Sequence, residues 1–258
     1  MESPKSNSSE AESSCRSTET EPAGKKPRLD PLTFSDPGSL VKLLIGEGPT
    51  PVEMSVHKEV ACQRSPILRA AFCGNSSEGN VETYDMQHVD ERTAKLLIQW
   101  LYTENLVVKQ LKEDWVEDGK VANEEDRNLI DLWVLADELQ MPALQNATVE
   151  TMYRTARKTR MTISNRNKQR LYRKTAKGSK LRLFLCQYIA HHAAPASYGL
   201  DSVPNPHDFW VDCTTYLSLQ WRTKSTKEFK ISDYFVEDIV CGHDDLSSIE
   251  VKNEATSL

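Results

Sequence analysis

The most unusual chemistry in this 258-residue sequence is a block of positive charge from residue 154 to residue 182. It holds twelve of the 32 Lys and Arg residues and none of the 38 Asp and Glu residues. Such a block can neutralise phosphates, with Tyr153 and Tyr172 stacking on bases, or contact an acidic protein. It can also be a solvated, partly helical surface. We define its basic patch as Arg154, Arg157, Lys158, Arg160, Arg166, Lys168, Arg170, Arg173 and Lys174.

Side chains for catalysis or metal binding form no recognisable pattern. No Ser/His/Asp or Cys/His grouping stands out. The six cysteines form no C-x-x-C pair, which favours reduced thiols in the nucleus or cytoplasm. A zinc site would need Cys186 with His191 and His192, or the pair Cys241 and His243, and neither has a paired-ligand spacing. We therefore predict no enzyme activity and no cofactor.

The N-terminal residues 1–33 are rich in Ser, Glu, Thr and Pro, a composition that predicts a disordered tail. Inside this tail, Lys25, Lys26 and Arg28 have the K-K-x-R spacing of a nuclear-import signal, and a chance cluster is the alternative. The start of the chain lacks the apolar stretch of a secretory signal. No run of about 18 apolar residues predicts a membrane-spanning helix.

The positioning elements begin near residue 39. Alternating apolar residues predict strands at 40–45, 52–57 and 81–84. Helical patterns follow at 58–62, 66–73 (capped by Ser65), 90–102, 129–139 and from 142 towards 152, with a polar loop from 109 to 126. We interpret the acidic runs 124–126 and 137–138 as solvated helix ends. The predicted class is α+β, with a sheet of three or four strands covered by about five helices.

Beyond residue 153 the pattern changes. We predict a basic linker at 154–178, with residues 159–168 as a loop, and a helical extension at 179–221 that starts with Ser179 as a cap. A loose charged tail would follow at 222–258, with residues 234–236 as an apolar docking peptide. The predicted core domain spans 34–153.

Several motifs in the first half resemble the BTB/POZ family. Trp100-Leu101-Tyr102-Thr103 is similar to its W-L-Y-T step. Residues 132–139 and 144–146 are similar to its L-x-x-L-A-D-x-L and L-Q-N helix pair. The signature residues are Val56, His57, Lys58, Ser65, Phe72, Trp100, Leu101, Tyr102, Leu135, Ala136, Asp137 and Leu139. From its position between a strand and a helix, we predict that His57 makes an internal hydrogen bond.

The form of these motifs resembles the fungal branch of the family, as does the Y-x-x-T-x-x-x-S-x-L-R pattern over residues 172–182. Two positions depart from the family. Three extra residues follow Ser35-Asp36, so no ligand-pocket role is carried over to Asp36. Glu104 stands where many members have Gly after the Tyr-Thr step.

The resemblance implies a protein-interaction adaptor that forms a homodimer through its first strand and helices. It also implies docking onto a cullin scaffold of a ubiquitin ligase, for which Leu129-Ile130-Asp131 has the expected hydrophobic-x-acidic composition. A helix with a buried Leu and an exposed Asp gives the same triplet by chance. The alternative function is a nuclear regulator that contacts nucleic acid through residues 154–182.

Overall fold

The computed structural model of the chain describes residues 31–32, 34–74, 83–192, 203–223 and 228–237. The chain divides into two units, Met1–Pro31 and Leu32–Leu258, and all the helices and strands described below lie in the second. The import motif at Lys25, Lys26 and Arg28 lies outside the described residues.

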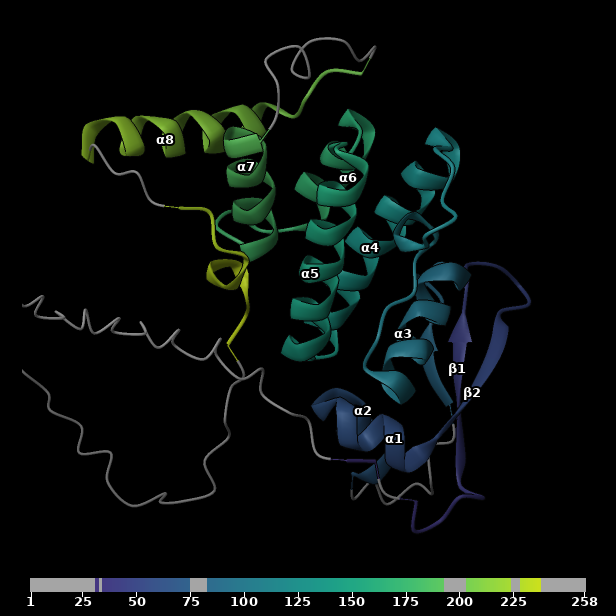
Figure 1. Ribbon diagram of the computed structural model, residues 1–258. Helices are drawn as coiled ribbons and strands as arrows, with labels where there is room; N and C mark the ends of the chain where they lie inside the picture. The colour runs from purple at the N-terminus through teal and green to yellow at the C-terminus, as the bar shows by residue number, and fades with distance from the viewer. Residues whose placement is uncertain (1–30, 33, 75–82, 193–202, 224–227, 238–258) are drawn as a thin grey trace, which may run out of the picture. The chain divides into compact units, whose positions relative to one another are not determined.

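A three-stranded sheet forms the start of the second unit (Figure 1). The central strand β1 (Leu40–Ile45) pairs antiparallel with β2 (Val52–His57) and parallel with β3 (Thr83–Met86). Every second residue of β1 is buried, as the pleat of a strand covered on one face requires. The predicted α+β class with a small sheet is confirmed.

Three helices follow the strands closely. Helix α1 (Lys58–Arg64) begins directly after β2, and α2 (Pro66–Cys73) begins after the single residue Ser65. Helix α3 (Glu91–Thr103) begins after Asp90, whose carboxylate accepts a hydrogen bond from the Arg92 N–H at 2.9 Å. These caps satisfy amide groups that the first turn of a helix leaves unpaired.

Two long helices come next. A short 3₁₀ turn, η1 (Lys109–Leu111), leads to α4 (Gly119–Glu138), which packs against α3 and against α5 (Pro142–Thr159). The predicted polar loop over 109–126 is therefore wrong in its second half. Asp118 starts α4 early, since its carboxylate accepts hydrogen bonds from the N–H groups of Lys120 and Val121 at 2.9 and 3.2 Å.

Helices also continue through the segment expected to be a linker. Helix α6 (Asn165–Lys174) packs on α4, α7 (Lys180–His192) packs on α8 (His207–Thr223), and η3 (Ile231–Tyr234) lies on α5 and α7. The loop predicted over 159–168 ends at Ser164, because this side chain caps α6 by accepting from the Asn167 N–H at 3.4 Å. Residues 154–178 are thus mainly helical.

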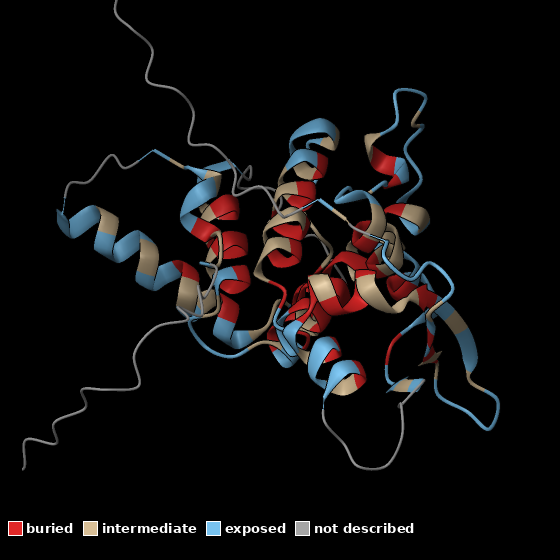
Figure 2. Cartoon of the chain, turned by 90° about the horizontal axis from the view of Figure 1, so that it is seen from below, coloured by how far each residue is buried: buried red, intermediate tan, exposed pale blue. Residues whose placement is uncertain are grey.

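One apolar cluster joins α4–α8 and η3. Phe184, Phe209 and Tyr234 lie in it with Trp133 and Leu171, and all five are buried. Figure 2 shows the buried residues along the inner sides of these helices, whereas α8 is mostly exposed and buries Phe209 and Cys213. The second half of the chain therefore shares a core with helices α4 and α5.

Candidate functional site

The junction between β2 and α1 is held by His57 and Tyr102. The Tyr102 hydroxyl oxygen accepts from the His57 backbone N–H at 3.0 Å and lies 2.8 Å from His57 Nδ1. The imidazole also makes an edge-to-face contact with Phe34, with ring centroids 5.3 Å apart. The predicted internal hydrogen bond of His57 is confirmed, and this ring links β2 to α3.

Ser65 connects two helices that are far apart in sequence. Its hydroxyl accepts from the Leu68 N–H at 3.1 Å, which caps α2, and donates to the Leu139 carbonyl at 2.8 Å. Because Leu139 ends α4, the buried hydroxyl fixes the end of α4 against the start of α2. The Ser65 hydroxyl therefore does more than cap α2, because it also joins α2 to the end of α4.

The end of α3 contains a residue in an unusual backbone conformation. Glu104 has φ 54° and lies in the left-handed region, where glycine is preferred. Its carboxylate pairs with Arg64, whose side chain is only 2% exposed. The glutamate at this family glycine position thus carries the backbone strain while it neutralises a buried guanidinium.

Asp131 on α4 anchors α6. Its carboxylate accepts two hydrogen bonds from Arg170, at 2.7 and 2.6 Å, and forms an ion pair with Lys174 at 2.9 Å. Asp131 is 7% exposed, so this pairing lies in a partly desolvated interface, where charge-assisted bidentate contacts are strong. Two residues of the basic patch, Arg170 and Lys174, therefore join α6 to α4.

In a comparison with family models, residues 41–156 match the BTB/POZ domain. Residues 41–156 form a BTB/POZ domain. No curated protein matches the chain. The matched segment runs from β1 to the last turns of α5, so α6, α7, α8 and η3 lie beyond it.

Most signature residues of the BTB/POZ domain are structural. Val56, Ser65, Phe72, Trp100, Leu101, Leu135, Ala136 and Leu139 are buried. Lys58 and Tyr102 are half-buried, and Asp137 accepts a hydrogen bond from Gln145 Nε2 at 3.1 Å. These contacts show that the residues position elements of the domain.

The triplet considered for cullin docking lies inside the molecule. Leu129 and Ile130 are fully buried, and Asp131 is engaged by Arg170 and Lys174. None of the three side chains is presented to a partner in this structure. Any cullin contact would have to use another surface.

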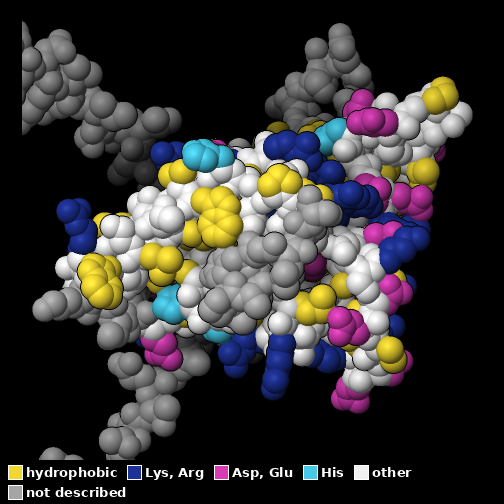
Figure 3. All heavy atoms as spheres, turned by 90° about the horizontal axis from the view of Figure 1, so that it is seen from above, with side chains coloured by type: hydrophobic (Ala, Val, Ile, Leu, Met, Phe, Trp, Pro, Cys, Tyr) yellow, Lys and Arg dark blue, Asp and Glu magenta, His cyan; other side chains and the backbone are white. Residues whose placement is uncertain are grey.

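The basic patch does not form one surface of free cations. Lys168 is buried, with Nζ 2.9 Å from Asn165 Oδ1 and 5.3 Å from the centre of the Phe209 ring. Arg182, just beyond the patch, is buried over the Tyr172 ring at 4.5 Å. On the face seen in Figure 3, Lys and Arg side chains stand in separate groups. The patch residues that are exposed are Arg154, Arg157, Lys158, Arg160, Arg166, Arg173 and Lys174.

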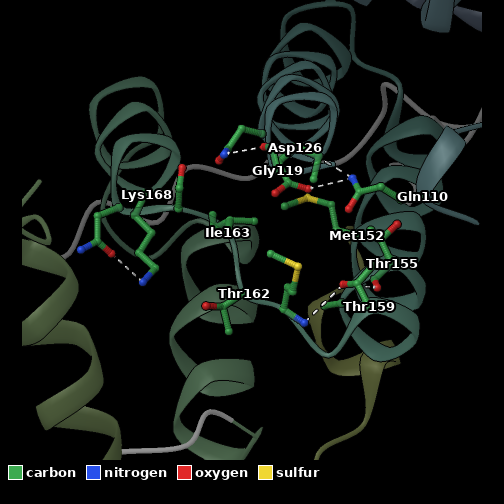
Figure 4. A pocket seen from close by; sticks show the side chains of 15 residues that line it. Gln110, Gly119, Asp126, Met152, Thr155, Thr159, Thr162, Ile163 and Lys168 are labelled. Atoms are coloured by element: carbon green, nitrogen blue, oxygen red, sulfur yellow. Dashed lines mark hydrogen bonds between the residues drawn. The ribbon is translucent and has the colours of Figure 1, made fainter. Parts of the chain in front are cut away.

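A cavity of about 350 Å³ lies between α4, α5 and the loop before α6 (Figure 4). Asp126 faces it and accepts from Gln110 Nε2 at 3.4 Å, and burial raises the pKa of Asp126 to about 7. The buried hydroxyl of Thr155 also lines the cavity and has no hydrogen-bond partner among the described residues. The prediction that Asp126 belongs to a solvated helix end is wrong, because Asp126 lies inside α4 and its half-buried carboxyl faces this cavity.

Part of the predicted charged tail is packed against the helices. Asn146 on α5 holds the backbone of Val236, accepting from its N–H at 2.6 Å and donating to its carbonyl at 2.9 Å. Phe229 stacks on Tyr153 with centroids 5.7 Å apart, and the Tyr234 hydroxyl donates to Gln187 Oε1 at 2.6 Å. The apolar residues expected to be a docking peptide thus dock within the chain.

The described residues contain no group of three or more His, Cys, Asp and Glu that could hold a metal ion. Cys186 is buried, and His191 lies 2.5 Å from the Tyr216 hydroxyl. Cys241 and His243 lie outside the described residues. No described helix is long and apolar enough to cross a membrane.

Proposed function

We propose that the chain is a non-enzymatic adaptor that forms a homodimer through its BTB/POZ domain and binds a protein partner. The observation that carries this proposal is the BTB/POZ domain itself at residues 41–156, which supports a role in protein-protein interaction. The homodimer and the adaptor role go beyond what this domain match shows.

Two exposed apolar side chains, Phe34 before β1 and Leu40 at its start, form a surface that a second copy of the chain could cover. Leu40 is 50% exposed and lies opposite His57 in the sheet register. Phe34 is 47% exposed and contacts the same His57 ring. Exposed apolar groups that cluster on a folded domain favour association, and the first strand is where the family resemblance places the dimer contact.

Sedimentation velocity of the full chain tests the dimer. We expect a dimer at micromolar concentration and a shift to monomer in a Phe34→Asp/Leu40→Asp variant, because two buried carboxylates would oppose association. Val116→Asp is the matched control, since Val116 is 81% exposed on the loop before α4. A monomeric wild-type chain at high micromolar concentration would refute the dimer.

Recruitment of a cullin-type ubiquitin ligase belongs to the same proposal and rests on the family resemblance. Co-sedimentation of the full chain with a purified cullin tests it directly. A complex would support the recruitment role, and separate migration at tens of micromolar would remove it.

We propose a nuclear or cytoplasmic location, supported by the scattered cysteines and by the basic cluster. Imaging of a fluorescent fusion tests the import motif. Replacing Lys25, Lys26 and Arg28 with Ala should reduce the nuclear signal, and an unchanged distribution would contradict a role for the cluster.

A further inference from the structure

Two cysteine thiols meet between the first two helices of the BTB/POZ domain. Cys62 lies in α1 and Cys73 is the last residue of α2. Their Sγ atoms are 2.9 Å apart, whereas a disulfide bond is roughly 2.0 Å long, so the sulfur atoms need to approach by about 1 Å. Both are free thiols in this structure. The two helices pack on each other, so no large rearrangement is needed to join them.

The two thiols differ in their access to solvent. Cys62 is 8% exposed, whereas Cys73 is exposed at the end of its helix. Burial raises the pKa of Cys62, and the adjacent Cys73 raises it further. Because the thiolate is the nucleophile, Cys62 is a poor first target for an oxidant. An exposed thiol beside a protected one has the arrangement of an attacking and a resolving cysteine.

We propose that Cys62 and Cys73 are a reversible disulfide site whose oxidant is a hydroperoxide. The Cys73 thiolate attacks the peroxide, its sulfur gains one oxygen as a sulfenic acid, and the O–O bond breaks to release water from hydrogen peroxide. Cys62 Sγ then attacks the sulfenic sulfur, and its proton leaves with the hydroxyl group as a second water molecule. Two thiols lose two electrons and the peroxide gains them.

The disulfide would cross-link the end of α2 to the middle of α1. Arg69 Nε already donates to the Cys62 carbonyl at 2.8 Å, so the same pair of helix segments is held by a second contact. The site needs no dimer and no bound partner, and it therefore stands independently of the proposed adaptor function.

A second cysteine pair in the chain provides an internal comparison. Cys186 on α7 and Cys213 on α8 are both buried, and Cys213 Sγ lies 3.8 Å from the Cys186 carbonyl oxygen. Neither offers an exposed sulfur to a peroxide. We expect this pair to stay reduced under conditions that oxidise the first pair.

The experiment treats the full wild-type chain with hydrogen peroxide, alkylates the remaining thiols and digests with trypsin without reduction. The expected product is a link between the peptide 59–64 and the peptide 70–92, with a mass about 2 Da below the sum of the two thiol peptides. Dithiothreitol should release both peptides. Cys186 and Cys213 should be recovered as reduced thiols once the chain is unfolded for alkylation.

Variants identify the order of reaction. In Cys73→Ser, Cys62 should remain reduced, and in Cys62→Ser, Cys73 should stop at sulfenic acid or be oxidised further. Circular dichroism checks that each variant is folded. If the wild-type chain yields over-oxidised Cys73 with reduced Cys62, or a disulfide between chains only, the proposal is overturned. Failure of both thiols to react would also overturn it.

Discussion

At the scale of single residues, Asp126 and Glu104 each carry a free-energy cost: the surroundings of Asp126 disfavour its charged form, and the backbone conformation of Glu104 is unfavourable for a residue other than glycine. Burial raises the pKa of Asp126 to about 7, and Glu104 lies in a left-handed conformation that favours glycine. Each has a partner that offsets part of this cost, Gln110 for the first and Arg64 for the second. The change in the free energy of unfolding on substitution should therefore depend on this local environment and not on residue type alone.

Asp126 should make the stability of the chain depend on pH. Its folded pKa of about 7 is above the unfolded value of about 3.9, so between these pH values the folded state binds more protons. The free energy of unfolding should consequently fall as pH rises from about 4 to about 7 and then level off. Urea unfolding of wild type and Asp126→Asn across this range measures the effect.

Asp126→Asn keeps a neutral side chain of the same shape, so this part of the slope should disappear. Above pH 7 the variant should be more stable than wild type. Asp114→Asn, which removes an exposed carboxylate from the loop before α4, serves as the control and should keep the slope. A parallel pH dependence in Asp126→Asn would show that the raised pKa of Asp126 is not the source of this slope.

Glu104 allows a comparison of strain with pairing. Glu104→Ala removes the partner of the buried Arg64 and keeps the left-handed backbone, whereas Glu104→Gly also relieves the strain. We expect both variants to be less stable than wild type, with Ala below Gly by about 1 kcal/mol. Urea midpoints measure the order. An Ala variant more stable than the Gly variant would argue against the left-handed conformation.

At the scale of elements, the segment 228–237 depends on contacts with α5 and α7. Asn146 gives it two hydrogen bonds to the Val236 backbone. Losing both should cost about 1 to 2 kcal/mol of docking free energy, which increases opening by roughly tenfold. In Asn146→Ala, amide hydrogen exchange of residues 228–237 should therefore accelerate by that factor, as mass spectrometry can measure.

Asn123→Ala is the matched control, because the Asn123 side chain bonds to the Gly119 carbonyl of its own helix and is exposed. This variant should leave exchange of residues 228–237 unchanged. Equal exchange in Asn146→Ala and wild type would show that the aromatic contacts of Phe229 and Tyr234 alone hold the segment.

Some of the helices and strands can be predicted from the sequence, and others cannot. Strands β1 and β2 and the Ser65 cap follow from alternation and local capping chemistry, and the BTB/POZ motifs are separated by short distances along the chain. The sequence does not predict the early start of α4 at Asp118 or the pairing of Asn146 with Val236. Asp118 stands within a polar stretch that has no apolar periodicity, and a side chain that bonds a distant backbone leaves no local pattern.

The pairing of the basic patch with Asp131 and the cavity beside Asp126 are harder to predict than the fold for the same reason. The sequence shows the basic patch as a charge anomaly, but nothing local in it indicates that Arg170 and Lys174 meet Asp131, about 40 residues earlier. The position of Asp126 beside the cavity likewise depends on α5 and the loop before α6, which the sequence does not place against α4.

At the scale of the whole molecule, the BTB/POZ match ends within α5 although the apolar cluster continues to Tyr234. A chain that ends after Arg160 would expose apolar residues of α4 and α5 that are buried in the cluster. We expect this shortened chain to aggregate and to bind the dye ANS.

The control for this shortened chain is a chain that ends after Glu237, which keeps every described element. It should remain monodisperse and unfold cooperatively. A monodisperse, cooperatively unfolding chain 1–160 would show instead that the matched domain is stable alone. Light scattering and urea unfolding distinguish these results.

The contact between Asn146 and Val236 also affects the order in which the chain folds during synthesis. These residues are 90 positions apart. At a synthesis rate of about 5–20 residues per second, roughly 4 to 18 s separate the appearance of Asn146 from that of Val236. During that interval α5 leaves the ribosome before the segment 228–237 is made. The face of α5 that this segment covers in the folded chain is then available to chaperones. The growing chain can complete the apolar cluster of α4–α8 and η3 only when Phe229 and Tyr234 have emerged.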